Sequence, residues 1–480
     1  MQQLAHRSEA GSRLRLRRPG DWGQALVFFA ALLGIPLVLA LSFARANELQ
    51  VIAVELCLLI LVLGPAVPFW GLVLFVGLLY VRPEEIIPGL QGMRLSLGVS
   101  MVTIAACLVQ LCVRRERVAS TPLNPMMLGF AAALIASTLP YGNTAEAATE
   151  VGKLAALVFL VVNLIRSPQR YRAFVTSILV FTAYVAAYSI YRYYTGGAMD
   201  HAGTLRSQTT GIFGDPNDLA AVMVAGIALI LVRLRNTSGF ARFCYSALGL
   251  VVLTATLLTN SRGGFLALLV VGGVFLLTHL KQRLAAVVLA VAIGMVLLVV
   301  APGRMTNFDS AEASANSRFW FWSNGISQLA ESPLTGVGFG RFAEVNGGML
   351  AHNSFVQCFA EVGLLGYFFW TGCIYSCFRR RRRSQEALPK KAAAIEGEIL
   401  GARLALLGFL AAAFWLSRTY VPVLYLFLAL PHAAQLSHSE AEGAKEGRYD
   451  PRLRPVDFLA IGACAIGSIL AINLLANGLR

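Results

Sequence analysis

Three side chains that suit phosphate and proton chemistry lie in polar stretches between apolar segments: Arg262, Arg318 and His352. Arginine binds phosphate and diphosphate through paired hydrogen bonds, and histidine is the usual proton-transfer residue near neutral pH. Simpler interpretations stay open, because an arginine can anchor a helix at a membrane boundary and a histidine can cap a helix entrance. Together the three residues favour a substrate with a lipid tail and a phosphorylated head.

A second polar group lies in the stretch 195–217 and just after it. The turn Asp215-Pro216-Asn217-Asp218 leads directly into an apolar segment, so Asn217 or Asp218 is expected to cap the helix that begins there. Contact with a ligand held at the start of that helix is the alternative. The same stretch carries Asp200, His201 and Arg206.

The polar stretch 302–353 is long, and a loop of that length in a compact protein usually has a function. Residues 317–330 are predicted to form an amphipathic helix with aromatic side chains at the membrane interface, and residues 332–340 a tight glycine-rich turn. The stretch ends at His352 and Asn353, where another apolar segment begins. Its arginines are Arg304, Arg318 and Arg341.

The apolar segment after His352 contains one acidic residue and a pair of glycines. A carboxylate such as Glu361 is costly in a membrane unless it is paired or lies in a wet cavity. It is therefore either a structural partner or part of a polar pocket. Gly363 and Gly366 are expected to permit close helix contact.

The composition indicates a protein that crosses a membrane many times. Hydrophobic residues make up 57% of the chain and charged residues only 14%, and the mean hydropathy is +0.66. These values exclude a soluble enzyme, a disordered protein and a coiled coil. The eight cysteines lie in apolar segments without a Cys-x-x-Cys pair, so neither a disulfide framework nor a zinc site is implied.

Fifteen apolar segments are candidate spans, with an error of one or two. They lie near 24–44, 50–66, 68–81, 95–113, 126–140, 153–165, 173–194, 218–232, 243–259, 263–280, 284–301, 354–377, 399–417, 419–434 and 456–477.

The net charge of +15 indicates how the chain is oriented in the membrane. With a cytoplasmic N-terminus, alternating spans place 27 of the 40 lysine and arginine residues in the segments assigned to the cytoplasm. The run Arg379 to Arg383 is the strongest inside marker, with possible contact to anionic lipids, and nucleic-acid binding is not expected. Arg262, Arg318 and His352 fall on the opposite, outer face.

The expected fold is all-α, a polytopic bundle of about 12–15 transmembrane helices with one long periplasmic loop containing short helices. The expected divisions are a basic N-terminus at 1–22, the first eleven spans at 23–301, the long loop at 302–353, one span at 354–377, a basic cytoplasmic loop at 378–398 and C-terminal spans at 399–480.

At these residues the chain resembles the O-antigen ligase and polymerase superfamily of bacterial inner-membrane glycosyltransferases. The family pattern His-[Asn/Ser/Gln]-x9-Gly-x-x-Gly matches His352, Asn353, Gly363 and Gly366. Further matches are Gly-x-Phe-x-x-Pro-Asn-x-Leu-Ala at 211–220, Ser-Arg-Gly at 261–263, Arg-x-x-x-Trp at 318–322 and Pro-Leu-x-Gly-x-Gly-x-Gly at 333–340. The resemblance covers about residues 205–370 in the family's order.

The resemblance implies an inverting, metal-independent transfer of a glycan from undecaprenyl diphosphate at the periplasmic face, without a cofactor. Arg262 and Arg318 would bind the diphosphate, and His352 would position or deprotonate the acceptor hydroxyl. Further candidates for substrate binding are Arg206, Asp215, Asn217, Asn353 and Arg341.

The implied activities differ in the acceptor that receives the glycan. An O-antigen ligase, which uses lipid A-core, is favoured over a polymerase, which uses another lipid-linked glycan, and over a protein O-oligosaccharyltransferase. A transporter of lipid-linked sugars is the alternative class. It predicts internal repeats and ionisable residues near the membrane centre, whereas here these residues gather at the outer boundary and no repeat is visible.

Overall fold

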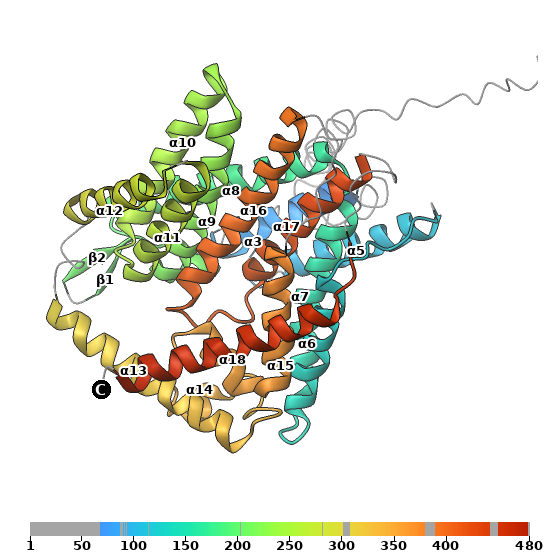
Figure 1. Cartoon of the computed structure of the whole chain (residues 1–480), viewed down its shortest axis with the longest axis vertical. Coiled ribbons are helices and arrows are strands. Elements are labelled where there is room, and N and C mark those ends of the chain that lie inside the picture. The colour runs from blue at the N-terminus through green and yellow to red at the C-terminus, as the bar shows by residue number, and fades with distance from the viewer. Residues whose placement is uncertain are drawn as a thin grey trace, which may run out of the picture.

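The computed structural model describes residues 68–86, 90, 92, 94–113, 115–201, 203–280, 282–300, 308–379, 389–441 and 450–478. These residues form a bundle of helices and one short β-hairpin (Figure 1). The expected spans at 24–44 and 50–66, and Arg304 of the long polar stretch, lie outside the described residues.

The elements follow one another as α3 (Pro68–Val81), α4 (Pro83–Ile86), α5 (Leu95–Val113), α6 (Leu123–Thr138), α7 (Thr144–Leu164), α8 (Pro168–Tyr194), β1 (Met199–His201), β2 (Thr204–Arg206), η2 (Gly211–Phe213), α9 (Pro216–Asn236), α10 (Gly239–Leu258), α11 (Arg262–His279), α12 (Arg283–Val300), α13 (Phe308–Glu331), α14 (Phe342–Val345), α15 (Ser354–Phe378), α16 (Pro389–Ala413), α17 (Pro422–Ala441) and α18 (Pro455–Gly478).

The helices confirm a polytopic all-α membrane protein. Eight described helices are long and apolar enough to cross a bilayer: α5, α7, α8, α9, α10, α11, α15 and α18. Two shorter helices, α6 and α12, are also apolar. The total number of spans stays a prediction.

Two helices organise the packing. Helix α9 is buried along most of its length and packs against α8, α10, α11 and α16. Helix α15 packs against α6, α13 and α18, and Figure 1 shows α13 and α18 side by side along one edge of the bundle. A Cβ at Gly264 would lie 2.5 Å from the Cβ of Ala220, so glycine there lets α11 approach α9 closely.

The hairpin of β1 and β2 is a feature that the sequence patterns do not predict. The strands are antiparallel, with Met199 opposite Arg206. The next residue fixes the hairpin to the turn between α10 and α11, because the Ser207 amide donates to the Leu258 carbonyl at 2.8 Å. The Asn260 side chain donates to the Leu205 carbonyl at 2.8 Å and ties the same two segments together.

Helix α15 covers the predicted span 354–377, but it contains a break. Gly363 has φ of +63° and ψ of −171°, which breaks the helix one third of the way along. A Cβ at Gly363 would lie 2.4 Å from the Leu334 carbonyl, so the close approach is to the glycine-rich turn and not to another helix. The predicted turn at 332–340 and the helix over 317–330 are both confirmed.

Candidate functional site

The start of α9 is capped by Asp215, and not by Asn217 or Asp218 as expected. The Asp215 carboxylate accepts hydrogen bonds from the Asn217 amide at 2.7 Å and from the Asn217 side-chain nitrogen at 2.9 Å. Pro216 takes the first helical position, where its missing N–H costs nothing. The prediction failed because Asp, Asn and Ser cap equally well and only the backbone decides between neighbours. The capping frees Asn217 Oδ1 and the Asp218 carboxylate for other partners.

Asn217 joins three segments through its side-chain oxygen. Arg206 Nη2 and Ser261 Oγ both donate to Asn217 Oδ1 at 2.8 Å. Arg206 is buried and its Nε also donates to the Thr259 carbonyl at 3.0 Å. Ser261 in turn caps α11 by accepting from the Gly264 amide at 3.1 Å. This network fixes the turn that carries Arg262, the half-buried first residue of α11.

Trp415, in the turn between α16 and α17, lies against both arginine-bearing segments. A Cβ at Gly263 would be 3.1 Å from the Trp415 side chain. The guanidinium carbon of Arg318, on α13, lies 5.9 Å from the centroid of the Trp415 ring. The structure therefore brings the Ser-Arg-Gly turn and Arg318 to the same tryptophan.

His352 occupies a constrained position directly before α15. Its φ is +48°, a left-handed conformation that few residues other than glycine adopt. On one side the Trp322 indole donates to the Ala351 carbonyl at 3.0 Å. On the other side the buried Asn353 caps α15 by accepting from the Phe355 amide at 2.9 Å. The backbone on both sides of His352 is thus fixed at the entrance of α15, and Asn353 rather than His352 is the cap.

Charged side chains from three elements act on the pKa of His352. Its pKa is lowered from the ordinary value of 6.5 by partial burial, and next by the positive charges of Arg318 and Arg418. The negative charge of Asp215 acts in the opposite direction. His352 is therefore neutral near pH 7, which is the form that accepts a proton.

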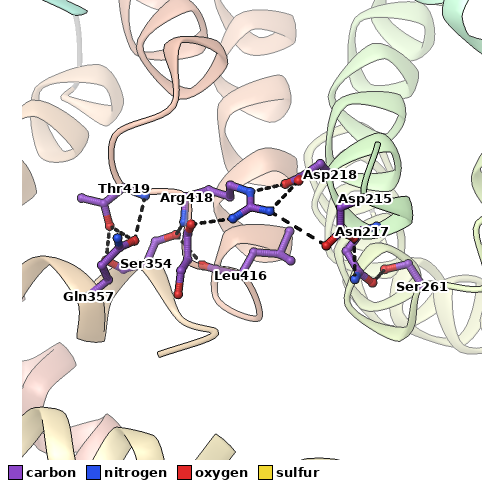
Figure 2. A network of polar contacts seen from close by, with 10 residues as sticks. Asp215, Asn217, Asp218, Ser261, Ser354, Gln357, Leu416, Arg418 and Thr419 are labelled. Carbon is purple, nitrogen blue, oxygen red and sulfur yellow. Dashed lines mark hydrogen bonds and ion pairs between the residues drawn. The ribbon is translucent and has the colours of Figure 1, made fainter. Parts of the chain in front are cut away.

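Arg418 is a site residue that sequence reasoning misses. Figure 2 shows its guanidinium between the turn after α16 and the start of α9, with Nε and Nη2 donating to the two Asp218 oxygens at 2.5 and 2.6 Å. Nη2 also lies 3.9 Å from an oxygen of Asp215. The Arg418 amide donates to Ser354 Oγ at 2.8 Å. Arg418 thus links α9 to the start of α15.

The signal that could have found Arg418 is its side of the membrane. It stands as one residue between the apolar segments 399–417 and 419–434. Counted by the alternation of spans, that turn falls on the outer face, where a positive charge is disfavoured. The same argument selects Arg262.

The break in α15 is built by main-chain hydrogen bonds to the glycine-rich turn. The amides of Val337 and Gly338 donate to the carbonyls of Ala360 and Glu361, both at 2.9 Å. The Glu361 carboxylate, which is buried, accepts from the Phe342 amide at 3.2 Å. Of the two interpretations left open for Glu361, this contact favours the structural partner.

Arg341 and the polar residues of the hairpin lie in other surroundings. Arg341 pairs with Glu344 at 2.9 Å and its guanidinium lies over the Tyr141 ring at 3.8 Å. Asp200 accepts from the Gly203 amide at 3.0 Å within the hairpin turn, and His201 ends β1. In the part of the chain that the structure describes, no group of three or more His, Cys, Asp or Glu residues could hold a metal ion.

Part of the chain matches a known protein family. Residues 247–371 match the family model described as O-antigen ligase, and no curated protein matches the chain. The matched segment contains Arg262, Arg318, His352 and Gly363. Residues 247–371 therefore carry an O-antigen ligase domain, within a chain whose long apolar helices make it a multi-pass membrane protein.

Proposed function

We propose that this protein transfers a glycan from undecaprenyl diphosphate to an acceptor hydroxyl, and that the acceptor is lipid A-core, as in an O-antigen ligase. The observation that carries the proposal is the shared environment of His352 and Arg318 within an O-antigen ligase domain. A neutral histidine beside arginines suits a reaction in which a hydroxyl loses a proton and a diphosphate gains charge.

The proposed step is an inverting displacement at the anomeric carbon, with no metal. His352 takes the proton of the acceptor hydroxyl, and the acceptor oxygen attacks the anomeric carbon from the side opposite the diphosphate. The bond between that carbon and the phosphate oxygen breaks, and its electron pair leaves with undecaprenyl diphosphate. Arg262 and Arg318 bind the diphosphate and stabilise the charge that develops on the leaving oxygen.

The charge of the cluster supports a diphosphate. Its arginines are Arg206, Arg262, Arg318 and Arg418, and its aspartates are Asp215 and Asp218. The formal charges of these six residues sum to +2, and a diphosphate substituted at both ends carries two negative charges. A substrate of this class therefore has a charge opposite to that of the six residues taken together.

The other predicted binding residues are assigned by their contacts. Arg206 and Asn353 position the site, because their polar groups bind Asn217 and the first turn of α15. Asp215 and Asn217, at the start of α9, are proposed to lie beside the glycan. Arg341 stays a candidate for the acceptor alone, since its contacts are with Glu344 and Tyr141.

The site is proposed to face the periplasm of a bacterial inner membrane, with the N-terminus in the cytoplasm. Arg233 and Arg235 end α9, and Asp218 begins it, roughly 20 Å away along the helix axis. Arg379 likewise follows the far end of α15 from His352. Basic residues thus gather at the membrane side away from the site, as the positive-inside rule requires of a periplasmic site.

Reconstitution in proteoliposomes tests the proposal. The purified protein is given undecaprenyl-diphosphate glycan with lipid A-core, with a second lipid-linked glycan, or with a serine-containing protein acceptor. Product on lipid A-core is the expected result. A ladder on the lipid carrier would indicate a polymerase, and product on protein an O-oligosaccharyltransferase. Movement of intact donor across the bilayer without transfer to any acceptor would replace the enzyme with a transporter.

A further inference from the structure

The hydrogen bonds of Arg418 use only part of its guanidinium group. Nε and Nη2 donate to the Asp218 carboxylate, and Nη1 donates to the Ser417 carbonyl at 2.9 Å. Arginine has five N–H donors. Among the described residues, these contacts leave one hydrogen on Nη1 and one on Nη2 without a hydrogen-bond acceptor, while an Asp215 oxygen forms a longer ion pair with Nη2 at 3.9 Å. A guanidinium binds phosphate in a bidentate manner through two of its hydrogens.

The backbone of Arg418 is fixed as firmly as its side chain. Its amide donates to Ser354 Oγ at 2.8 Å, and the same oxygen donates to the Leu416 carbonyl at 2.6 Å. Thr419 Oγ1 donates to the Ser354 carbonyl at 2.7 Å (Figure 2). Ser354 is the second residue after His352, so the turn that carries Arg418 is bound to the segment that carries the histidine.

The positive charges of Arg418 and Arg318 both act on the His352 side chain. Both guanidinium groups oppose protonation of the His352 imidazole, and Asp215 acts against them. Arg318 comes from α13 and Arg418 from the turn before α17, so the two cations approach His352 from different elements. A group with negative charge beside His352 would therefore be attracted by both.

We propose that Arg418 is a third phosphate-binding arginine of the donor site and that Asp218 holds its guanidinium ready for the phosphate. The carboxylate takes the Nε hydrogen and one Nη2 hydrogen, and leaves one hydrogen on Nη1 and one on Nη2 for the phosphate. Phosphate can then bind without a change of rotamer, which lowers the entropic cost of binding. This inference rests on the proposed function, since it names a contact to the diphosphate of the proposed donor.

Kinetics with varied donor and acceptor test the contact. Arg418→Ala is expected to raise the KM for undecaprenyl-diphosphate glycan about 10- to 100-fold, the effect of losing a charged hydrogen bond, with the acceptor KM within about twofold of wild type. Arg418→Lys keeps the positive charge but cannot bind phosphate in a bidentate manner. Its donor KM should therefore lie between those of wild type and Arg418→Ala. Equal changes in both KM values, or none, would overturn the proposal.

Two further variants separate a binding role from a structural one. Asp218→Asn should raise the donor KM by less than Arg418→Ala, and the double variant should be no worse than Arg418→Ala alone, because Asp218 acts through Arg418. Additive effects would contradict that. Arg172→Ala is the matched control: it breaks the Arg172–Glu398 pair of 2.7 Å at the other end of the bundle and should leave the donor KM unchanged.

Binding of undecaprenyl diphosphate without a glycan distinguishes failure of this inference from failure of the proposed function. In lipid nanodiscs, wild type should bind this probe about 10-fold or more tightly than Arg418→Ala. If no acceptor is glycosylated but this difference is seen, the proposed transfer fails and the phosphate contact stands. If transfer occurs and the two proteins bind the probe equally, the proposed function stands and Arg418 has no such role.

Discussion

The indole nitrogen of Trp322 donates a hydrogen bond of 3.0 Å to the backbone carbonyl of Ala351, the residue that precedes His352. Trp322 is fully buried and lies one helical turn after Arg318 on α13. One turn of α13 therefore carries both a cation that acts on His352 and the hydrogen bond that fixes the backbone before it. Since His352 has a φ of +48°, this hydrogen bond helps to hold a conformation that costs energy.

Replacing Trp322 with phenylalanine should impair the proposed transfer more than it impairs folding. The ring remains large enough to fill the core, but the Ala351 carbonyl loses its donor, which costs about 1–3 kcal/mol. We expect a lower thermal midpoint and a roughly 10-fold lower kcat, because the His352 backbone is released. Trp320→Phe is the control, since Trp320 is half-exposed on the same helix. Equal kcat values for the two variants would show that Trp322 does not position His352.

Gly363→Ala should destabilise the protein more than any ordinary glycine substitution in a helix. The φ of +63° and ψ of −171° at Gly363 are essentially restricted to glycine and cost other residues about 1–3 kcal/mol. The added Cβ would also lie 2.4 Å from the Leu334 carbonyl. We expect a large drop in the thermal midpoint and poor recovery from the membrane. Gly467→Ala in α18 has open space around its Cβ and should be neutral or slightly stabilising. A normal thermal midpoint for Gly363→Ala would mean that the break in α15 is not required.

The sequence was sufficient where a signal is local. Apolar length predicts the spans, and polar residues at span boundaries select Arg262, Arg318 and His352. The helix over 317–330 and the glycine-rich turn after it follow from periodicity and turn residues. What these patterns cannot supply is which of the selected side chains meet, because that depends on packing between α9, α13 and α15.

The features that sequence reasoning misses depend on distant partners. The break at Gly363 is made by main-chain hydrogen bonds to residues 333–338, so neighbours in the chain do not reveal it. Asp218 pairs with Arg418, 200 residues away. Arg206 donates hydrogen bonds to Thr259 and Asn217 within the protein, and its predicted role in substrate binding stays a prediction. A polar residue beside a site has the same appearance in sequence whether it binds substrate or holds its neighbour.

Removal of either His352 or Arg318 should abolish transfer without preventing membrane insertion. His352→Ala removes the proposed base and is expected to lower kcat at least about 100-fold. Arg318→Ala removes a cation that stabilises the leaving group, and the loss should be of similar size. His279→Ala, at the far end of α11 from Arg262, is the control and should keep wild-type turnover. Normal turnover in His352→Ala would exclude His352 as the base.

The pH dependence of kcat/KM should report the lowered pKa of His352. Only neutral imidazole accepts a proton, so activity should rise as pH rises through that pKa and level off near neutral pH. The midpoint is expected below 6.5, since burial and then the charges of Arg318 and Arg418 outweigh Asp215. Arg418→Gln removes one of the two cations and should move the midpoint to higher pH. Arg172→Gln, at the opposite end of the bundle, should leave it in place. A midpoint above 6.5 in wild type, or an equal shift in both variants, would contradict this electrostatic account of His352.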